Sequence, residues 1–125
     1  MDKAKILIVD DNKELLELLQ EYLLEHDFDV VCSSNGRDAR NMFVEFKPQI
    51  VITDIVMPDV DGIELLLRIR EINPDIQVIA MSGGNEGHGD TYLQMADKLG
   101  ANLILNKPFS LSELLIEVNK LVASM

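Results

Sequence analysis

The sequence has little of what several protein classes require. Its 125 residues include no Trp, two Tyr and four Phe, so an aliphatic core is expected. The single Cys32 excludes an intramolecular disulfide and fits a reducing compartment. No apolar run approaches the ~20 residues of a membrane-spanning helix, and the short run after Lys5 is not typical of a signal peptide. We therefore expect a cytoplasmic protein without membrane insertion.

Basic charge is also scarce. The chain has 11 Lys and Arg against 22 Asp and Glu, which gives a formal net charge of −11. A nucleic-acid-binding surface needs a basic stripe to replace phosphate counterions, so this composition argues against DNA or RNA as partner. The Gly-rich stretch at 83–89 lacks the Gly-x-x-x-x-Gly-Lys pattern of a nucleotide P-loop. A cation or a basic protein is the more natural complement.

What the chain does contain is a regular alternation of apolar runs and helical stripes. The runs predict strands at 5–9, 28–32, 76–81 and 103–105, and one that begins at Ile50 and ends at Asp54. Apolar residues spaced three and four apart predict helices around 15–23, 39–46, 65–72, 92–99 and 114–122. This alternation predicts an α/β fold with a parallel sheet covered on both faces. We expect a single domain over 1–125, flavodoxin-like and doubly wound, with strand order 2-1-3-4-5 in three layers.

Two sets of residues suggest helix starts. Ser110 and Glu113 form a capping box before the last helical stripe. Asp11 and Glu14 resemble another capping box, so Asp10 and Asp11 have an alternative role as mere helix caps.

Polar residues end several of the predicted strands. Asp10 and Asp11 follow the first, Asp54 ends the third, Ser82 follows the fourth and Lys107 the fifth. Ligands of such sheets bind beyond these carboxyl ends, near the point where the strand order reverses. Two carboxylates ~5 Å apart repel by about 3 kcal/mol at an effective dielectric constant of ~20. The cluster therefore needs a counter-charge, and hard carboxylate oxygens suit Mg²⁺.

These groups are the parts that phosphoryl transfer requires. Asp54 would attack in line as the nucleophile, while the metal and Lys107 would neutralise charge on the phosphoryl oxygens. The product would be an aspartyl phosphate, with Ser82 and the amide of Gly83 bonded to its oxygens. The simpler alternatives are that Ser82 is an ordinary turn residue and Lys107 a loop lysine.

The residues that carry this argument resemble the receiver domain of two-component response regulators. The resemblance covers essentially the whole chain, and its motifs follow in the right order: Ile8-Val9-Asp10-Asp11-Asn12, Asp54 with Met57-Pro58 and Gly62, Met81-Ser82-Gly83, and Lys107-Pro108-Phe109. Because the sequence ends at Met125, soon after the last helical stripe, we expect a stand-alone single-domain type that resembles the chemotaxis regulator.

The resemblance implies a function and a ligand set. A histidine kinase, or a phosphotransfer protein, would pass a phosphoryl group from a phosphohistidine to Asp54. Asp10, Asp11, Asp54 and the backbone carbonyl of Val56 would hold Mg²⁺, for which Mn²⁺ could substitute. Lys107 would reach the phosphate, commonly beside a cis bond to the following proline.

The resemblance also implies a switch. Ser82 would move toward the phosphate and reshape the surface of the fourth helix, fifth strand and fifth helix, where a downstream protein would bind. We expect a monomer or weak dimer. Ile104 stands where many members have a switching aromatic, so an aromatic rotating inward cannot be the mechanism here. Val56 offers no polar group to orient a water, which predicts slow hydrolysis of the aspartyl phosphate unless a partner phosphatase contributes such a group.

Two rival functions remain at this point. The first is an enzyme, a small Asp-nucleophile phosphohydrolase that uses the same Mg²⁺ site on outside substrates. The second is a degenerate receiver that only binds partners and is never phosphorylated. Adjacent acids in place of an Asp-x-Asp pair, and the intact set of site residues, favour a phosphoacceptor that catalyses only its own phosphotransfer and dephosphorylation.

Overall fold

Continuous apolar runs form the strands of one parallel sheet. The computed structural model describes residues 3–55, 62–83, 94 and 100–125. Its strands are β1 (Lys5–Val9), β2 (Asp29–Ser33), β3 (Ile50–Asp54), β4 (Gln77–Gly83) and β5 (Leu103–Lys107). They lie in the order β2-β1-β3-β4-β5, and every neighbouring pair is parallel. The predicted doubly wound topology is confirmed.

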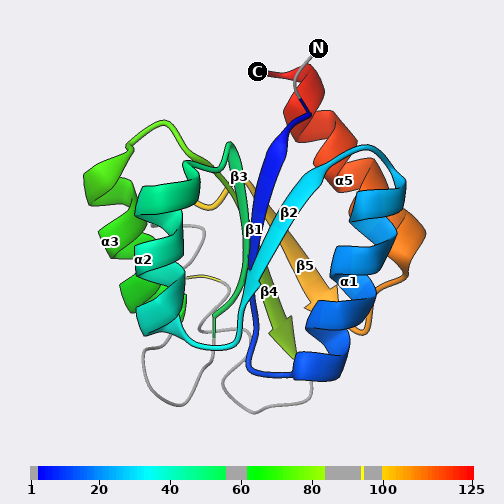
Figure 1. The fold of residues 1–125 in the computed structure, drawn as a ribbon, viewed down its shortest axis with the longest axis horizontal. Coiled ribbons are helices and arrows are strands. Elements are labelled where there is room, and N and C mark those ends of the chain that lie inside the picture. The colour runs from blue at the N-terminus through cyan, green and yellow to red at the C-terminus, as the bar shows by residue number, and fades with distance from the viewer. Residues whose placement is uncertain (1–2, 56–61, 84–93, 95–99) are drawn as a thin grey trace.

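Helices cover both faces of this sheet (Figure 1). On one face lie α1 (Lys13–Glu25) and α5 (Leu111–Ala123), and on the other lie α2 (Gly36–Phe46) and α3 (Gly62–Ile72). The fourth helix predicted at 92–99 lies outside the described residues apart from position 94. No helix in the described ranges is long and apolar enough to cross a membrane.

The pleat of β1 divides the core into two layers. Ile6 and Ile8 pack into the cluster shared with α1 and α5, whereas Leu7 and Val9 pack into the cluster shared with α2 and α3. Successive side chains of a strand point to opposite faces, so a strand covered on both faces must be apolar throughout. This requirement explains why the run from Lys5 to Val9 does not alternate with polar residues.

Two strands extend further than the sequence predicts. The expected strand at 76–81 continues through Gly83, and the expected strand at 103–105 continues through Lys107. The cause is their mutual pairing, because Ser82 lies opposite Asn106 and Gly83 opposite Lys107 in the ladder. Ser82 and Lys107 are therefore strand residues, held by the sheet instead of by loops.

The start of α1 also differs from the prediction. Asn12, and not Asp11, is the N-cap: its side-chain oxygen accepts a hydrogen bond from the Leu15 backbone N–H at 3.1 Å. Asn caps helices as well as Asp does, so the capping role passes to Asn12 and leaves the Asp11 carboxylate available elsewhere. The helix start predicted at Ser110 is confirmed: Ser110 is the N-cap of α5, and its hydroxyl accepts a hydrogen bond from the Glu113 N–H.

Candidate functional site

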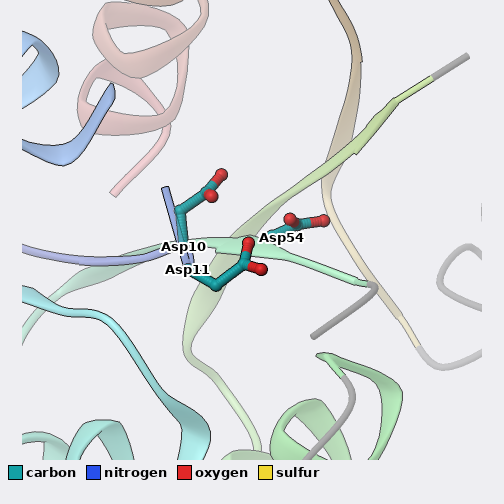
Figure 2. Close-up of side chains that lie close together, drawn as sticks. All are labelled: Asp10, Asp11 and Asp54. Atoms are coloured by element: carbon teal, nitrogen blue, oxygen red, sulfur yellow. The ribbon is translucent and has the colours of Figure 1, made fainter. Parts of the chain in front are cut away.

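Three carboxylates meet at the carboxyl edge of the sheet. Asp10 and Asp11 follow β1, and Asp54 ends the neighbouring strand β3 (Figure 2). One oxygen from each of the three lies within 4.8 Å of the others. Asp10 is fully buried, Asp54 is 6% exposed and Asp11 is exposed. The predicted acidic cluster therefore exists, with two acids enclosed by protein and one facing solvent.

Lys107 bridges the two buried acids. Its Nζ lies 2.6 Å from Asp10 Oδ2 and 3.3 Å from Asp54 Oδ2. Burial by itself lowers the pKa of Lys107, but the hydrogen bond to Asp10 and the charges of Asp54 and Asp10 outweigh it, so the pKa is raised overall. Lys107 is therefore held as a cation at neutral pH. Its peptide bond to Pro108 is cis, in agreement with what the resemblance implies.

Asp10 is fixed from two sides. Its second oxygen, Oδ1, accepts a hydrogen bond from the Asn12 backbone N–H at 2.9 Å, and its own backbone N–H donates to the Ser33 carbonyl at 3.2 Å. Both carboxylate oxygens of Asp10 therefore have partners within the chain. Asp11 is the exposed acid of the three and faces an incoming group from solvent.

The donor set fits a divalent cation. Three carboxylates and one ammonium group leave the cluster with two negative charges. Oxygen ligands, partial exposure through Asp11 and this residual charge match Mg²⁺, which keeps several waters and takes few protein carboxylates. Mn²⁺ prefers the same kind of ligand. The Val56 carbonyl, predicted as a further ligand, lies outside the described residues.

Ser82 brings a buried hydroxyl to the same edge. Asp54 pairs with Met81 across β3 and β4, so Ser82 lies one residue beyond the level of Asp54. The side chain is fully buried, and in the described part of the chain its Oγ has no hydrogen-bond partner. A buried hydroxyl without a partner has an energetic cost, and a phosphoryl oxygen is one group that could satisfy it. Gly83, the predicted phosphate contact, follows at the end of β4.

Gly62 positions the strand end that carries Asp54, a role that the sequence pattern did not reveal. A Cβ at Gly62 would lie 2.1 Å from the Asp54 carbonyl oxygen and 2.3 Å from the Ile55 Cα, so only glycine fits. The Gly62 N–H donates to the Ile55 carbonyl at 3.0 Å. The first residue of α3 is thus packed directly on the backbone of the candidate acceptor. In the sequence, Gly62 stood out only as part of the motif that follows Asp54.

Ile104 lies behind the site. It is half-buried in β5, opposite Ala80 of β4, and packs against the small cluster of Ile55, Ile63 and Ala80. The expectation that switching proceeds without an aromatic at this position stays a prediction.

The sequence also matches a family model. The model of the response regulator receiver domain matches residues 6–119. The chain belongs to this family. A receiver domain from Clostridium thermocellum is 31% identical, with a TM-score of 0.88 over 97% of this chain and 95% of that one. The receiver domain of the Francisella response regulator 1452 is 29% identical, with a TM-score of 0.83 over 95% and 96%.

Curated relatives are longer than this receiver domain. The response regulator SaeR of Staphylococcus epidermidis is 32% identical over 120 residues, which are 96% of this chain and 51% of that protein. The chain thus spans about half the length of the curated relatives it matches.

Proposed function

We propose that this receiver domain accepts a phosphoryl group from a histidine kinase phosphohistidine onto Asp54. The observation that supports this most directly is the Lys107 ammonium, which lies within 3.3 Å of Asp54 while also bonding to Asp10. A lone acid at a strand end would serve as a turn residue, whereas one beside a fixed cation and two further acids is equipped for phosphoryl transfer.

In the proposed step an oxygen of the Asp54 carboxylate attacks phosphorus in line with the phosphorus–nitrogen bond of the phosphohistidine. The new oxygen–phosphorus bond forms as the phosphorus–nitrogen bond breaks, and the imidazole leaves with the electron pair and takes up a proton from solvent. Asp11 and Asp54, with Asp10 behind them, would hold Mg²⁺. When bound, the metal supplies positive charge that offsets repulsion between the carboxylate and the phosphoryl oxygens.

Lys107 and Ser82 would act on the phosphoryl oxygens once they arrive. Lys107 is pre-positioned as a cation, so little reorganisation is needed for it to stabilise developing negative charge. The Ser82 hydroxyl would donate a hydrogen bond to a phosphoryl oxygen and thereby gain the partner that it lacks among the described residues.

We further propose that this bond shifts the packing of the surface formed by the fourth helix, β5 and α5, where a downstream protein binds. At the end of the β4–β5 ladder, Ser82 lies opposite Asn106 and Lys107 lies opposite Gly83. A change at either side chain would therefore be transmitted along β5, toward Ile104. Only contacts that differ between the two states can shift the population, and the bond to the phosphoryl group is such a contact.

The experiment is phosphorylation of the purified chain in Mg²⁺, first by a small donor such as acetyl phosphate and then by candidate histidine kinases. Mass spectrometry should find one phosphoryl group, located on Asp54 by peptide mapping. Asp54→Asn should abolish it, and chelation of Mg²⁺ should prevent it in the wild type. A modified Asp10 or Asp11, or no modification under any donor, would overturn the proposal and favour a module that only binds partners.

We also propose that the chain acts in the cytoplasm.

We further propose that the chain is not a general phosphohydrolase. With p-nitrophenyl phosphate in Mg²⁺, it should release no more nitrophenol than one equivalent per protein. Continued turnover that Asp54→Asn abolishes would instead support the enzyme.

A further inference from the structure

We propose that the groove between α2 and α3 binds a small organic phosphate, a molecule with a phosphate ester at one end and an apolar or aromatic moiety at the other. This site is separate from the carboxylate cluster. It lies over the helices on the opposite face of the sheet from α1 and α5 (Figure 1). Its lining residues are Gly36, Arg37, Arg40, Asn41, Val44, Glu64, Leu65 and Arg68.

The first argument is the concentration of arginine. The chain has four arginines, and three of them, Arg37, Arg40 and Arg68, line this one groove. Glu64 is the one acid among the described lining residues, so three arginines and one glutamate give a formal charge of +2, part of which the Glu71 contact of Arg68 offsets. The whole chain carries −11. The groove is therefore a basic site on an acidic protein, and an anion is its natural complement.

The second argument is that these cations lack strong partners. Across the described ranges neither Arg37 nor Arg40 forms a salt bridge. Arg68 has only an exposed contact with Glu71 at 3.6 Å, and such pairs contribute little stability. Arginine offers a planar fork that binds the oxygens of phosphate in pairs. Arg37 and Arg40, three residues apart on one helix, point to the same side and can share one phosphate.

The third argument concerns the polarity along the groove. Arg37 lies in the first turn of α2, where the helix dipole favours negative charge, and Val44 lies two turns further on. Val44 is 52% exposed, whereas Leu65 of α3 is buried beside it in the lining. The groove thus places an exposed apolar side chain, Val44, in the same lining as the arginines. Its volume of about 410 Å³ is within the range of small-molecule sites.

The test is calorimetric titration of the metal-free chain with adenosine monophosphate, glucose 6-phosphate and inorganic phosphate in separate experiments. Chelator is present so that no metal recruits phosphate to the carboxylate cluster. We expect saturable binding with one site per chain, tightest for adenosine monophosphate because its base can pack against Val44. Val44→Asn should weaken adenosine monophosphate alone, and Glu64→Gln should tighten all three phosphates.

The double variant Arg37→Gln/Arg40→Gln should weaken binding by about tenfold or more. Its matched control is Lys3→Gln/Lys120→Gln, which removes the same charge from exposed sites elsewhere and should stay within about twofold of the wild type. Equal loss in both doubles would overturn the proposal, because net charge and not the groove would then hold the anion. Equal affinity for inorganic phosphate and adenosine monophosphate, or no saturable binding, would overturn it too.

This outcome is independent of the proposed phosphoacceptor function. Asp54→Asn should bind adenosine monophosphate as the wild type does, even though it cannot be phosphorylated.

Discussion

Two partly buried cations lie at opposite ends of the β4–β5 pair, and they face different acceptors. At the carboxyl edge, Lys107 contacts the carboxylates of Asp10 and Asp54. At the amino edge, Arg70 of α3 donates to the carbonyl oxygens of Ile76 and Gly100, each just before a strand. Lys107 contacts charged carboxylates of the proposed phosphorylation site, whereas Arg70 donates to neutral oxygens among the described residues.

The difference is visible in the two pKa shifts. The carboxylates raise the pKa of Lys107 in spite of its burial. Arg70 has its pKa lowered, because burial outweighs the nearby charge of Asp75. Neutral carbonyls satisfy N–H groups but compensate a buried charge less than carboxylates do. Lys107 is thus suited to chemistry that changes the charge around it, and Arg70 to holding chain segments together.

The largest expected difference between Lys107 and Arg70 is in the rate at which Asp54 is phosphorylated. Lys107→Met should slow phosphorylation of Asp54 by about a hundredfold or more, because a positioned charge on the phosphoryl oxygens is lost. Arg70→Met should leave the rate within about threefold of the wild type, since Arg70 contacts no site residue in the described part of the chain. Both rates are measured with acetyl phosphate below the unfolding temperature of each variant. A comparable loss in the two variants would show that Lys107 acts only through folding.

Arg70→Met should lower the free energy of unfolding. Its guanidinium also donates to the Pro74 carbonyl and the Asn102 side chain, so one residue joins α3 to the segments before β4 and β5. We expect a loss of about 1–2 kcal/mol in urea unfolding, because four oxygens lose their donor at once, although only the hydrogen bond to Ile76 is part-buried. The matched control is Arg68→Met, whose exposed contact with Glu71 should be worth less than about 1 kcal/mol.

These two cations also show how much the sequence could predict. The strand order and the meeting of Asp10, Asp54 and Lys107 followed from apolar periodicity and from parallel strands ending at one edge. The bridge from Lys107 to Asp10 did not, because it depends on side-chain reach across three strands. The Arg70 contacts could not be predicted from the sequence, because every residue has a backbone carbonyl and nothing marks that of Gly100 as an acceptor.

Other residues were misplaced for similar reasons. Asp11 and Asn12 are equally good caps by type, and only the geometry of the turn decides that Asn12 takes the role. Ser82 read as the residue after a strand, because strand length depends on the partner ladder and not on the apolar run alone. Gly62 showed no sign of its contact with the Asp54 carbonyl, which is a tertiary packing constraint.

Mg²⁺ binding at the carboxyl edge should raise the free energy of unfolding, and this gain should depend on Asp11 and not on Arg70. At a Mg²⁺ concentration ten times its dissociation constant, the wild type should gain about 1.4 kcal/mol of unfolding free energy. Asp11→Asn should lose most of this gain, because it removes the exposed ligand while leaving the Lys107 contacts in place. Arg70→Met should keep the full gain on its lower baseline. An equal gain in Asp11→Asn would contradict the assignment of the metal to this cluster.

The smallest expected difference between Lys107 and Arg70 is in how the free energy of unfolding depends on pH. A raised pKa means that the folded state holds the Lys107 proton more tightly than the unfolded chain, whose ordinary value is 10.5. The stabilisation from Lys107 is therefore complete below pH 10.5 and is lost as pH rises through the folded pKa, at no more than about 1.4 kcal/mol per pH unit. The difference in unfolding free energy between the wild type and Lys107→Met, measured in chelator, should stay constant at neutral pH and shrink only above that value. Burial raises the pKa of the Cys32 thiol to about 11, but this group titrates in both proteins and cancels in the difference. The same difference taken for Arg70→Met should not shrink in this range, because a lowered pKa means that loss of the Arg70 proton favours the folded state. A parallel decline there would show that both cations report general alkaline unfolding.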